Sequence, residues 1–433
     1  MREKQETHAE CNISDLDIFT PAFVQTDILK GRFEDVFPLS NIEDGGPLEF
    51  SINNTSEKFL DLANSYLKLS FRVMKADGSE LDADAKVTVA NYSIASIFSQ
   101  LDIILNGKNI SSSTNLYPYR AMFETLMNYG KDTLKSQLEM GLFMLDGHTK
   151  EVARVTTNKG LKKRFELTDK SEIVHVLGRL HSDLFHQGRL ILNGLPLRIK
   201  LHRSKDSFCL LSVEANADYK LKIVDAVFCV RKVELTPTKF QEIQQVLEGR
   251  RVVYPINRVV LKTHSLSAGL TSATWENAIL GQLPNRIILA LVDNDACSGV
   301  YTKNPFFFQH FNATQVGVYL NGVSLPRDPI RMDFSKRDYI QAYHSLLSAS
   351  GKLYRDESMG LDIDSFANGC TLFGFDCTPS LCNGAHQEIK KQVNVRIVLD
   401  FAEALPRTVT LLMYLDFDNI ISVDRMRNVL LDY

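Results

Sequence analysis

Three cysteines and one histidine between positions 370 and 386 are the side chains whose types best fit chemistry in this sequence. Thiolates and imidazoles bind Zn²⁺, typically through closely spaced pairs such as C-x-x-C. The sequence has no such pair here, and Phe373 and Phe375 indicate that Cys370 lies on a strand, where a small thiol serves packing. We therefore predict no metal site, with three residues kept as weak candidates: Cys377, Cys382 and His386.

Charged and aromatic clusters are the next candidates. Aspartates two residues apart share one face of a strand and could serve glycoside chemistry or Ca²⁺ binding, although aspartate is also common at loop edges, which we favour. These pairs are Asp293/Asp295, Asp362/Asp364 and Asp416/Asp418. The basic segment Lys159–Arg164 predicts a solvated loop, with a DNA- or partner-facing role as the alternative. The run Phe306–Phe308 predicts core packing, or else a subunit interface.

Motifs of the common enzyme classes do not occur. The sequence contains no G-x-x-x-x-G-K-[ST] or G-x-G-x-x-G phosphate loop, no H-E-x-x-H and no G-x-S-x-G, and its ten histidines are dispersed. We therefore predict a protein that is not an enzyme, with no catalytic residues, no cofactor and no small-molecule substrate.

Length and composition indicate a globular protein of two or three domains. The chain has 433 residues, of which 44% are hydrophobic and 23% charged. Its net charge of -3 argues against a broad sequence-independent grip on nucleic acid. Met1–Cys11 is polar, without the apolar segment of a secretory signal, and seven scattered cysteines fit reduced thiols in an intracellular folding environment.

Alternating apolar and polar residues predict that strands dominate the chain. Tyr66–Met74 alternates strictly, and so do the segments around residues 195–201, 393–401 and 409–415. Asn-Gly pairs follow several such strands, and this dipeptide tolerates the positive φ angles of a type I′ hairpin turn. Two of these predicted turns are formed by Asn106 with Gly107 and by Asn321 with Gly322.

The two hairpin turns belong to an internal repeat. Each follows a strand and precedes a predicted helix, one ending at Gly130 and the other at Gly351, and the turn glycines are 322 − 107 = 215 residues apart. This separation fits a duplicated sandwich domain. We predict an all-β protein of two tandem eight-stranded jelly rolls with a few short helices. The predicted divisions are an N-terminal arm (1–44), a first jelly roll (45–235), a linker helix (236–250) and a second jelly roll with a C-terminal tail (251–433).

Two segments lack strand periodicity. The apolar residues of the arm are irregularly spaced, so we expect it to dock on another subunit or, equally, to pack as a strand or coil on its own sandwich. Deleting residues 1–40 is expected to leave the fold intact and to impair assembly. Lys131–Arg164 is predicted to form loops at the outer or intersubunit surface; a place in the core would refute this.

Several motifs in order resemble the double jelly-roll major capsid proteins of Polinton (Maverick) elements and adintoviruses, from about residue 17 to the end. The most distinctive block is Ile97–Gly107 followed by Tyr117–Arg120 and Glu124–Leu126. Other matching stretches are Pro47–Phe50, Phe59–Leu62, Tyr254–Pro255, Gly281–Pro284, Asn304–Phe306, Tyr339–Leu346, Asp424–Arg425 and Val429–Tyr433. The Cys377 to His386 group is not a feature of this family.

The resemblance implies a capsid protein of which three copies form a pseudo-hexameric capsomer. Such capsomers tile an icosahedral shell around double-stranded DNA, held only loosely, with penton or minor capsid proteins as further partners. The implied location is the virion capsid, assembled inside the host cell. The alternatives are a secreted hydrolase or glycan-binding protein built on two jelly rolls, a minor capsid protein, and a domesticated host protein that no longer forms virions.

Overall fold

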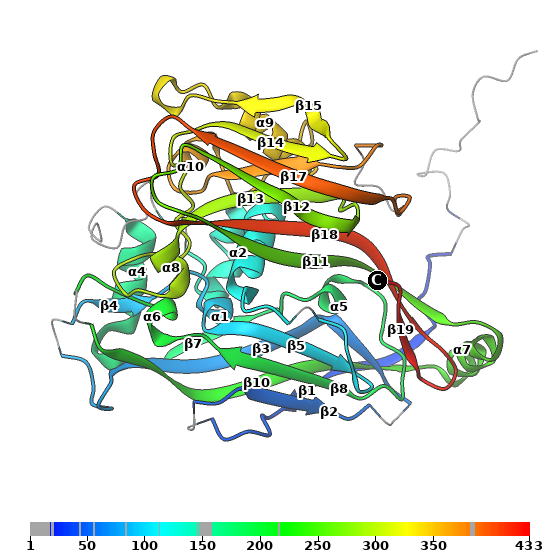
Figure 1. The fold of residues 1–433 in the computed structure, drawn as a ribbon. Helices are drawn as coiled ribbons and strands as arrows, with labels where there is room; N and C mark the ends of the chain where they lie inside the picture. The colour runs from blue at the N-terminus through cyan, green and yellow to red at the C-terminus, as the bar shows by residue number, and fades with distance from the viewer. Residues whose placement is uncertain are drawn as a thin grey trace, which may run out of the picture.

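The computed structural model of this chain is dominated by strands, and its helices are short. No helix within the described residues is long and apolar enough to cross a membrane. Figure 1 shows two β-units stacked on each other, one from each half of the chain. The described residues are 18, 21–42, 45–54, 57–82, 85–111, 113–144, 146, 158–214, 217–381 and 386–433.

The first half of the chain forms the lower unit in Figure 1. Its strands are β1 (Ile28–Val36), β2 (Leu48–Ile52), β3 (Phe59–Lys75), β4 (Val87–Val89), β5 (Phe98–Leu105), β6 (Lys108–Asn109), β7 (Val174–Gly178), β8 (Leu197–Arg203), β9 (Leu210–Ser212) and β10 (Tyr219–Leu235). Its helices are α1 (Ser93–Ser96), α2 (Tyr117–Asn128), α3 (Lys131–Leu134), α4 (Lys159–Thr168), α5 (Asp183–His186) and α6 (Asp206–Cys209), with 3₁₀ turns at Gln137–Gly141 and Asp169–Ser171.

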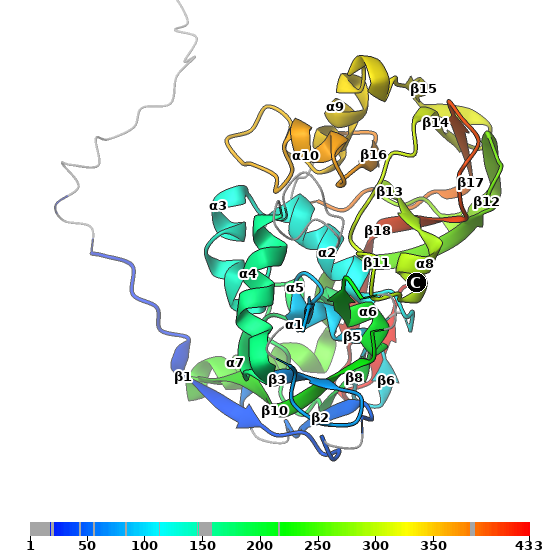
Figure 2. The same cartoon turned by 90° about the vertical axis from the view of Figure 1, so that its left-hand side faces the viewer.

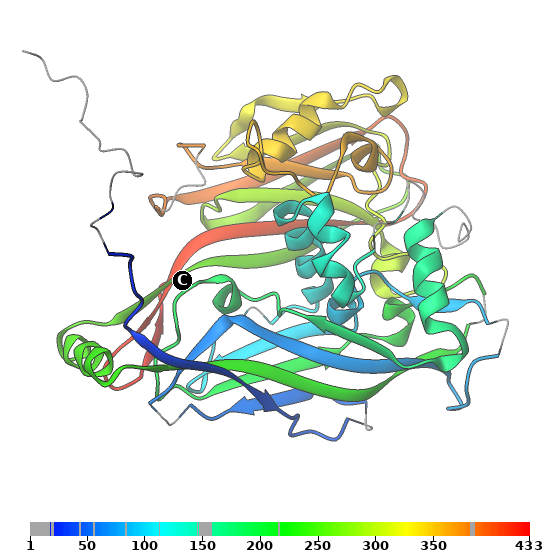
Figure 3. The ribbon, with the colours of Figure 1, turned by 180° about the vertical axis from the view of Figure 1, so that it is seen from behind.

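Helix α7 (Pro237–Gly249) leads from the lower to the upper unit and lies at the edge of the molecule, as Figure 3 shows from behind. The second half contains β11 (Val252–Leu266), β12 (Ser272–Gln282), β13 (Arg286–Asp293), β14 (Ala313–Leu320), β15 (Val323–Arg331), β16 (Leu372–Asp376), β17 (Gln392–Phe401), β18 (Val409–Val423) and β19 (Val429–Leu431). Its helices are α8 (Asn294–Ser298), α9 (Ile340–Ala349) and α10 (Ile363–Ala367), with a 3₁₀ turn at Phe334–Lys336.

The two units have the same strand order. In the first, the sheets run β1-β10-β3-β7 and β2-β8-β5-β6; in the second, they run β11-β18-β13-β16 and β12-β17-β14-β15. Each strand of these four-stranded rows therefore has an equivalent in the other unit, in the same chain order, whereas β4, β9 and β19 lie outside the shared order. All of these pairs are antiparallel. This arrangement confirms the predicted pair of eight-stranded jelly rolls.

Period-two burial explains why the sheets pair face to face. In β8 and β17 buried apolar residues alternate with residues that remain at least partly exposed. The predicted hairpins are present: β5 and β6 are joined by a two-residue turn in which Asn106 and Gly107 have φ of 46° and 79°. Between β14 and β15, Asn321 and Gly322 have φ of 50° and 88°. Both turns have the positive φ angles of a type I′ hairpin.

The N-terminal segment differs from the predicted arm. Ile28–Val36 forms β1, which pairs with β10 at the edge of the first sheet and is equivalent to β11 of the second jelly roll. The alternative expectation, a strand packed on its own sandwich, therefore describes this part. Residues 1–17, 19 and 20 lie outside the described residues. Pro21–Asp27 is exposed and irregular.

The prediction of surface loops for Lys131–Arg164 was wrong for most of its described part. This segment contains α3, a 3₁₀ turn and the beginning of α4, and its apolar side chains Leu134, Leu142, Phe143, Met144 and Leu161 join the hydrophobic core. Lys159–Arg164 is likewise helical instead of a solvated loop. Arg164 is fully buried, where it donates to Asp146 at 3.0 Å and to the Val89 carbonyl at 3.2 Å. Residues 147–157 lie outside the description.

Helix α2 lies between the two jelly rolls (Figures 1 and 2), and its aromatic side chains pack against rings of the second jelly roll. The ring centroid of Phe123 lies 5.2 Å from that of Phe308 and 6.1 Å from that of Tyr414 on β18. The ring centroid of Tyr119, one turn earlier, lies 5.8 Å from that of Phe306. Phe306 and Phe308 are thus buried core residues, as expected, and they join the two jelly rolls into one hydrophobic core.

Candidate functional site

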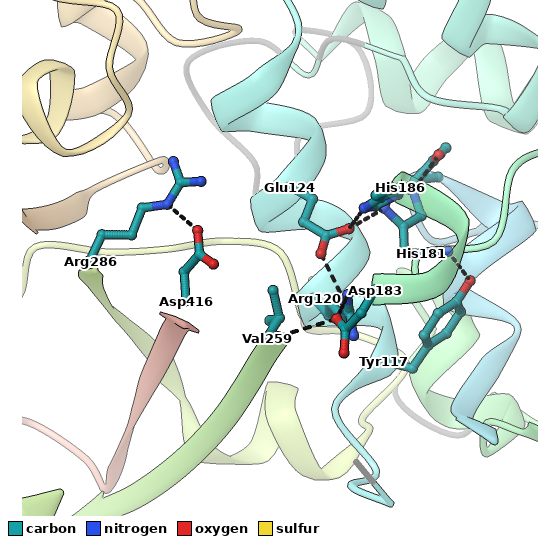
Figure 4. Close-up of polar contacts among 10 residues, drawn as sticks. Tyr117, Arg120, Glu124, His181, Asp183, His186, Val259, Arg286 and Asp416 are labelled. Atoms are coloured by element: carbon teal, nitrogen blue, oxygen red, sulfur yellow. Dashed lines mark hydrogen bonds and ion pairs between the residues drawn. The ribbon is translucent and has the colours of Figure 1, made fainter. Parts of the chain in front are cut away.

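A buried polar cluster accompanies this aromatic contact where the first jelly roll meets the second. We call it the seam cluster and define it as Arg120 and Glu124 of α2 together with His181, Asp183 and His186 in and before α5 (Figure 4). The Tyr117-Pro118 start of α2 favours helix from its first turn, since proline suits this position. The four-residue spacing then places Arg120 and Glu124 on one helical face.

Glu124 is the centre of the seam cluster. Its Oε1 accepts from Arg120 Nε at 2.9 Å, while its Oε2 lies 2.6 Å from His181 Nδ1 and 3.7 Å from His186 Nδ1. The side chains of Glu124 and His181 are 3% and 4% exposed, whereas that of His186 is 32% exposed. One carboxylate therefore contacts a cation on one side and two imidazoles on the other.

Further hydrogen bonds hold His181 and Asp183 of the seam cluster in place. His181 Nε2 lies 2.8 Å from the Tyr92 hydroxyl, and the backbone amide of His181 donates to Tyr117 Oη at 3.2 Å. Asp183 Oδ1 accepts from Arg120 at 2.5 Å and from the backbone amide of Val259 on β11 at 3.2 Å. The cluster thus ties α2 and α5 of the first jelly roll to the first strand of the second.

Opposing influences set the charge of Glu124. Burial alone would raise its pKa, but the Arg120 guanidinium and the two imidazoles override this effect and hold the pKa well below its usual range. Arg120 shows the same balance in reverse: burial opposes its charge, but Asp183 and Glu124 raise its pKa. Both groups are therefore ionised at neutral pH.

A polar cleft opens beside the seam cluster. It has a volume of about 320 Å³, and its walls include Glu124, His181 and His186 from the first jelly roll and Arg286 and Asp416 from the second. Arg286 Nε donates to Asp416 Oδ2 at 2.6 Å, and Figure 4 shows this pair to one side of the cluster. The other carboxylate oxygen of Asp416 is buried and has no hydrogen-bond partner among the described residues. The cleft can therefore hold a small polar ligand or ordered water.

The two predicted turns make separate structural contacts. Asn106 Nδ2 donates to the carbonyl of Arg427 in the C-terminal segment at 2.8 Å. Asn321 Oδ1 accepts from the backbone amide of Asn394 at 2.9 Å. Each turn therefore stabilises its own jelly roll or the tail, and the structure does not bring them together with the seam cluster.

The weak metal candidates are only partly described. Cys377 follows β16 and is buried, and burial raises the pKa of its thiol. His386 is more than half exposed and lies 3.9 Å from Glu388. Cys382 lies outside the described residues, so the expectation of no metal site among these three stays a prediction.

Asp293 and Asp362 lie at the ends of elements, as the loop-edge interpretation expects, but Asp416 and Asp418 lie within strand β18, where that interpretation was wrong. Lys303 Nζ lies 3.0 Å from Asp293 and 2.6 Å from Asp295. Asp362 caps α10 by accepting from the Ser365 amide at 2.8 Å. Asp418 accepts from the backbone amide of Glu388 at 3.1 Å.

Comparison with known proteins identifies the family of this chain. Residues 87–421 match the family model described as the double jelly roll-like domain, and the chain belongs to this family. The uncharacterized protein F54H12.2 of Caenorhabditis elegans is 25% identical over 420 residues, which cover 94% of this chain and 98% of that protein.

Solved structures of viruses have the same fold. A chain of the Sputnik virophage aligns with a TM-score of 0.63 at 10% identity, covering 98% of this chain and 93% of its own. The mavirus major capsid protein aligns with a TM-score of 0.58 at 12% identity, covering 100% and 96%. A chain of the PBCV-1 virus capsid gives 0.55 at 10% identity, covering 96% and 99%.

Proposed function

We propose that this protein is a major capsid protein, a non-enzymatic subunit of a viral shell. The observation that carries the proposal is the pair of jelly rolls with identical strand order, joined by a continuous core within one chain. The likeness to the mavirus major capsid protein over nearly the full length of both chains supports it. The ordered sequence motifs of Polinton and adintovirus capsid proteins support it independently.

Three copies of the chain would form the building block of the shell. Because each copy supplies two similar sandwiches, a closed three-fold ring presents six, which gives a trimer the outline of a hexagon. A rigid connection between the jelly rolls is needed for such a tile, and the seam cluster together with the Phe123–Phe308 contact supplies it. Capsomer edges then provide the contacts of an icosahedral lattice.

The N-terminal segment fits a role in contacts between subunits. Before β1, the large apolar residues Ile18, Phe23 and Val24 have exposed fractions between 76% and 103%. Apolar side chains concentrated in one exposed segment are typical of a surface that is covered on assembly. We propose that the residues before β1 dock on a neighbouring subunit. We also propose two jelly rolls separated by the linker (236–250), with β1 belonging to the first jelly roll.

Further partners follow from the same proposal. Penton or minor capsid proteins would close the vertices, and double-stranded DNA would be enclosed with few direct contacts, in keeping with the net charge of -3. The protein would assemble inside the host cell and reside in the virion capsid. The C. elegans relative favours an origin in an element integrated into an animal genome, which leaves a domesticated protein without virions as the second candidate.

The mass of the purified chain in solution separates these candidates. Size-exclusion chromatography with light scattering is expected to give three copies of the 48.9 kDa chain at micromolar concentration. Raising the concentration or lowering the salt should then produce sheets or closed particles. A monomer that persists at the highest soluble concentration would contradict the capsomer and favour the domesticated protein.

A further inference from the structure

The seam cluster also has the composition of a metal site. Glu124, His181 and His186 bring one carboxylate oxygen and two imidazole nitrogens within 4.8 Å of one another. We propose that these three side chains bind one divalent transition-metal ion of the Zn²⁺ class inside each subunit. Two imidazoles and a carboxylate are a ligand set that Zn²⁺ and Co²⁺ accept, with water completing the coordination.

Two of the three distances between ligand atoms require only a small adjustment to admit the ion, and the two imidazole nitrogens lie within 4.8 Å of each other. Ligand atoms about 2.0–2.1 Å from a tetrahedral metal lie about 3.4 Å from one another. Glu124 Oε2 is 3.7 Å from His186 Nδ1, close to that value, and 2.6 Å from His181 Nδ1. The metal would therefore replace the Glu124–His181 hydrogen bond, with the two side chains separating by less than about 1 Å.

The surroundings orient two of the three ligands. The Nε2 atom of His181 lies 2.8 Å from the Tyr92 hydroxyl, which leaves Nδ1 directed toward Glu124. Arg120 holds the Oε1 atom of Glu124 at 2.9 Å, so Oε2 remains for the ion. Hydrogen bonds of this kind to the far atom of a ligand raise metal affinity because they fix its orientation.

Charge and access also fit a dication. Glu124 and Asp183 contribute two negative charges and Arg120 one positive charge, so the cluster with neutral histidines has a net charge of −1. The cleft of about 320 Å³ borders all three ligands, and His186 is the partly exposed one of the three. An ion can therefore enter from the cleft, and water from the cleft can occupy the remaining coordination positions.

Binding would stiffen the contact between the jelly rolls. The ligands come from α2 and from the segment containing α5, and the same segment bonds β11 through Asp183. An ion that binds only the folded chain stabilises it by mass action. Metal should therefore raise the melting temperature of the subunit, whatever its state of assembly.

The test uses the full chain without a polyhistidine tag, stripped of metal with EDTA and dialysed. Titration with Zn²⁺ in a calorimeter should give one site per chain, and Co²⁺ should give visible d–d absorption. His186→Gln removes the ligand with the fewest other contacts and should weaken binding by more than about tenfold. His175→Gln changes an exposed histidine on β7 and should leave the site intact. Cys377→Ser tests the cysteine group separately.

The inference is supported if one Zn²⁺ binds per chain, raises the melting temperature and is lost in His186→Gln but retained in the other two variants. Circular dichroism of His186→Gln without metal verifies that its fold is intact. Absence of stoichiometric binding would overturn the inference. Binding that survives His186→Gln, or that disappears in Cys377→Ser, would overturn it equally, because the ion would then lie elsewhere.

Discussion

The backbone amide of Leu192 in the first jelly roll donates to the hydroxyl of Tyr254 on β11, in the second, at 2.8 Å. Tyr254 is completely buried, and its hydroxyl also lies 3.3 Å from the carbonyl of Leu190. One side chain of the second jelly roll thus satisfies the backbone of the first. This buried hydrogen bond therefore helps to fix the position of one jelly roll relative to the other within the chain.

Tyr254→Phe is expected to lower the free energy of unfolding by about 1–2 kcal/mol, because the buried Leu192 amide loses its acceptor. Urea unfolding followed by circular dichroism measures this. Tyr354→Phe removes a hydroxyl from a side chain that is 92% exposed and serves as the control. Equal free energies of unfolding for the two variants would show that this hydrogen bond does not stabilise the contact between the jelly rolls.

Arg120→Met is expected to be more damaging than Tyr254→Phe. It leaves two buried carboxylates, Glu124 and Asp183, without their cation, and loss of one partner from a buried ion pair costs about 3–5 kcal/mol. The variant should unfold at clearly lower urea concentration or fail to accumulate in soluble form. Arg327→Met, at a side chain that is 96% exposed, should match the wild type. A stable Arg120→Met protein would contradict the structural role given to the seam cluster.

A second connection between the halves should give the stability a pH dependence. Asp362 pairs with Lys131; burial would raise its pKa, but hydrogen bonds from Lys131 and Ser365 lower the pKa to about 2. A carboxyl whose pKa is lower in the folded state stabilises the fold above its unfolded pKa of about 3.8, and this contribution is lost as the pH falls toward 2.

The urea midpoint of the wild type should therefore fall between about pH 5 and pH 2 more steeply than that of Asp362→Asn or Lys131→Met. Because both side chains are more than a third exposed, high salt should reduce the difference. Identical pH profiles for the wild type and both variants would rule out this ion pair as a contributor.

Two truncations test the role of the N-terminal segment. Removal of residues 1–26 leaves β1 intact, so the folded subunit should keep its melting temperature while forming fewer shells. Removal of residues 1–40, first expected to spare the fold, also deletes the edge strand beside β10 and should lower the melting temperature. Shells that form normally without residues 1–26 would contradict the docking role.

The sequence predicted those parts of the fold that rest on local periodicity. The hairpins at Asn106 and Asn321 follow from turn chemistry, and the sandwiches from alternating burial. Strand β1 was predicted only as one of two alternatives because it is an exposed edge strand without an alternating pattern. The helix of Lys159–Arg164 was missed because its charge suggested solvent, although Arg164 is buried against Asp146.

The seam cluster could not be predicted because its two groups of residues, one in α2 and one in and before α5, are distant in sequence. Glu124 and His181 are 57 residues apart and meet only through the packing of α2 beside α5. The local signals are the four-residue spacing of Arg120 and Glu124 and the short segment His181–His186, and each equally describes a solvated surface. Buried charge that depends on tertiary packing leaves no mark in composition or periodicity.

Electron microscopy of the purified chain tests the proposed capsomer most directly. Averaged images of single particles should show three-fold tiles with a hexagonal outline formed by six sandwich-sized lobes, and at higher concentration sheets or closed shells of these tiles. Particles with only two lobes at every concentration, the size of one chain, would contradict the proposal that this double jelly roll is a capsid subunit.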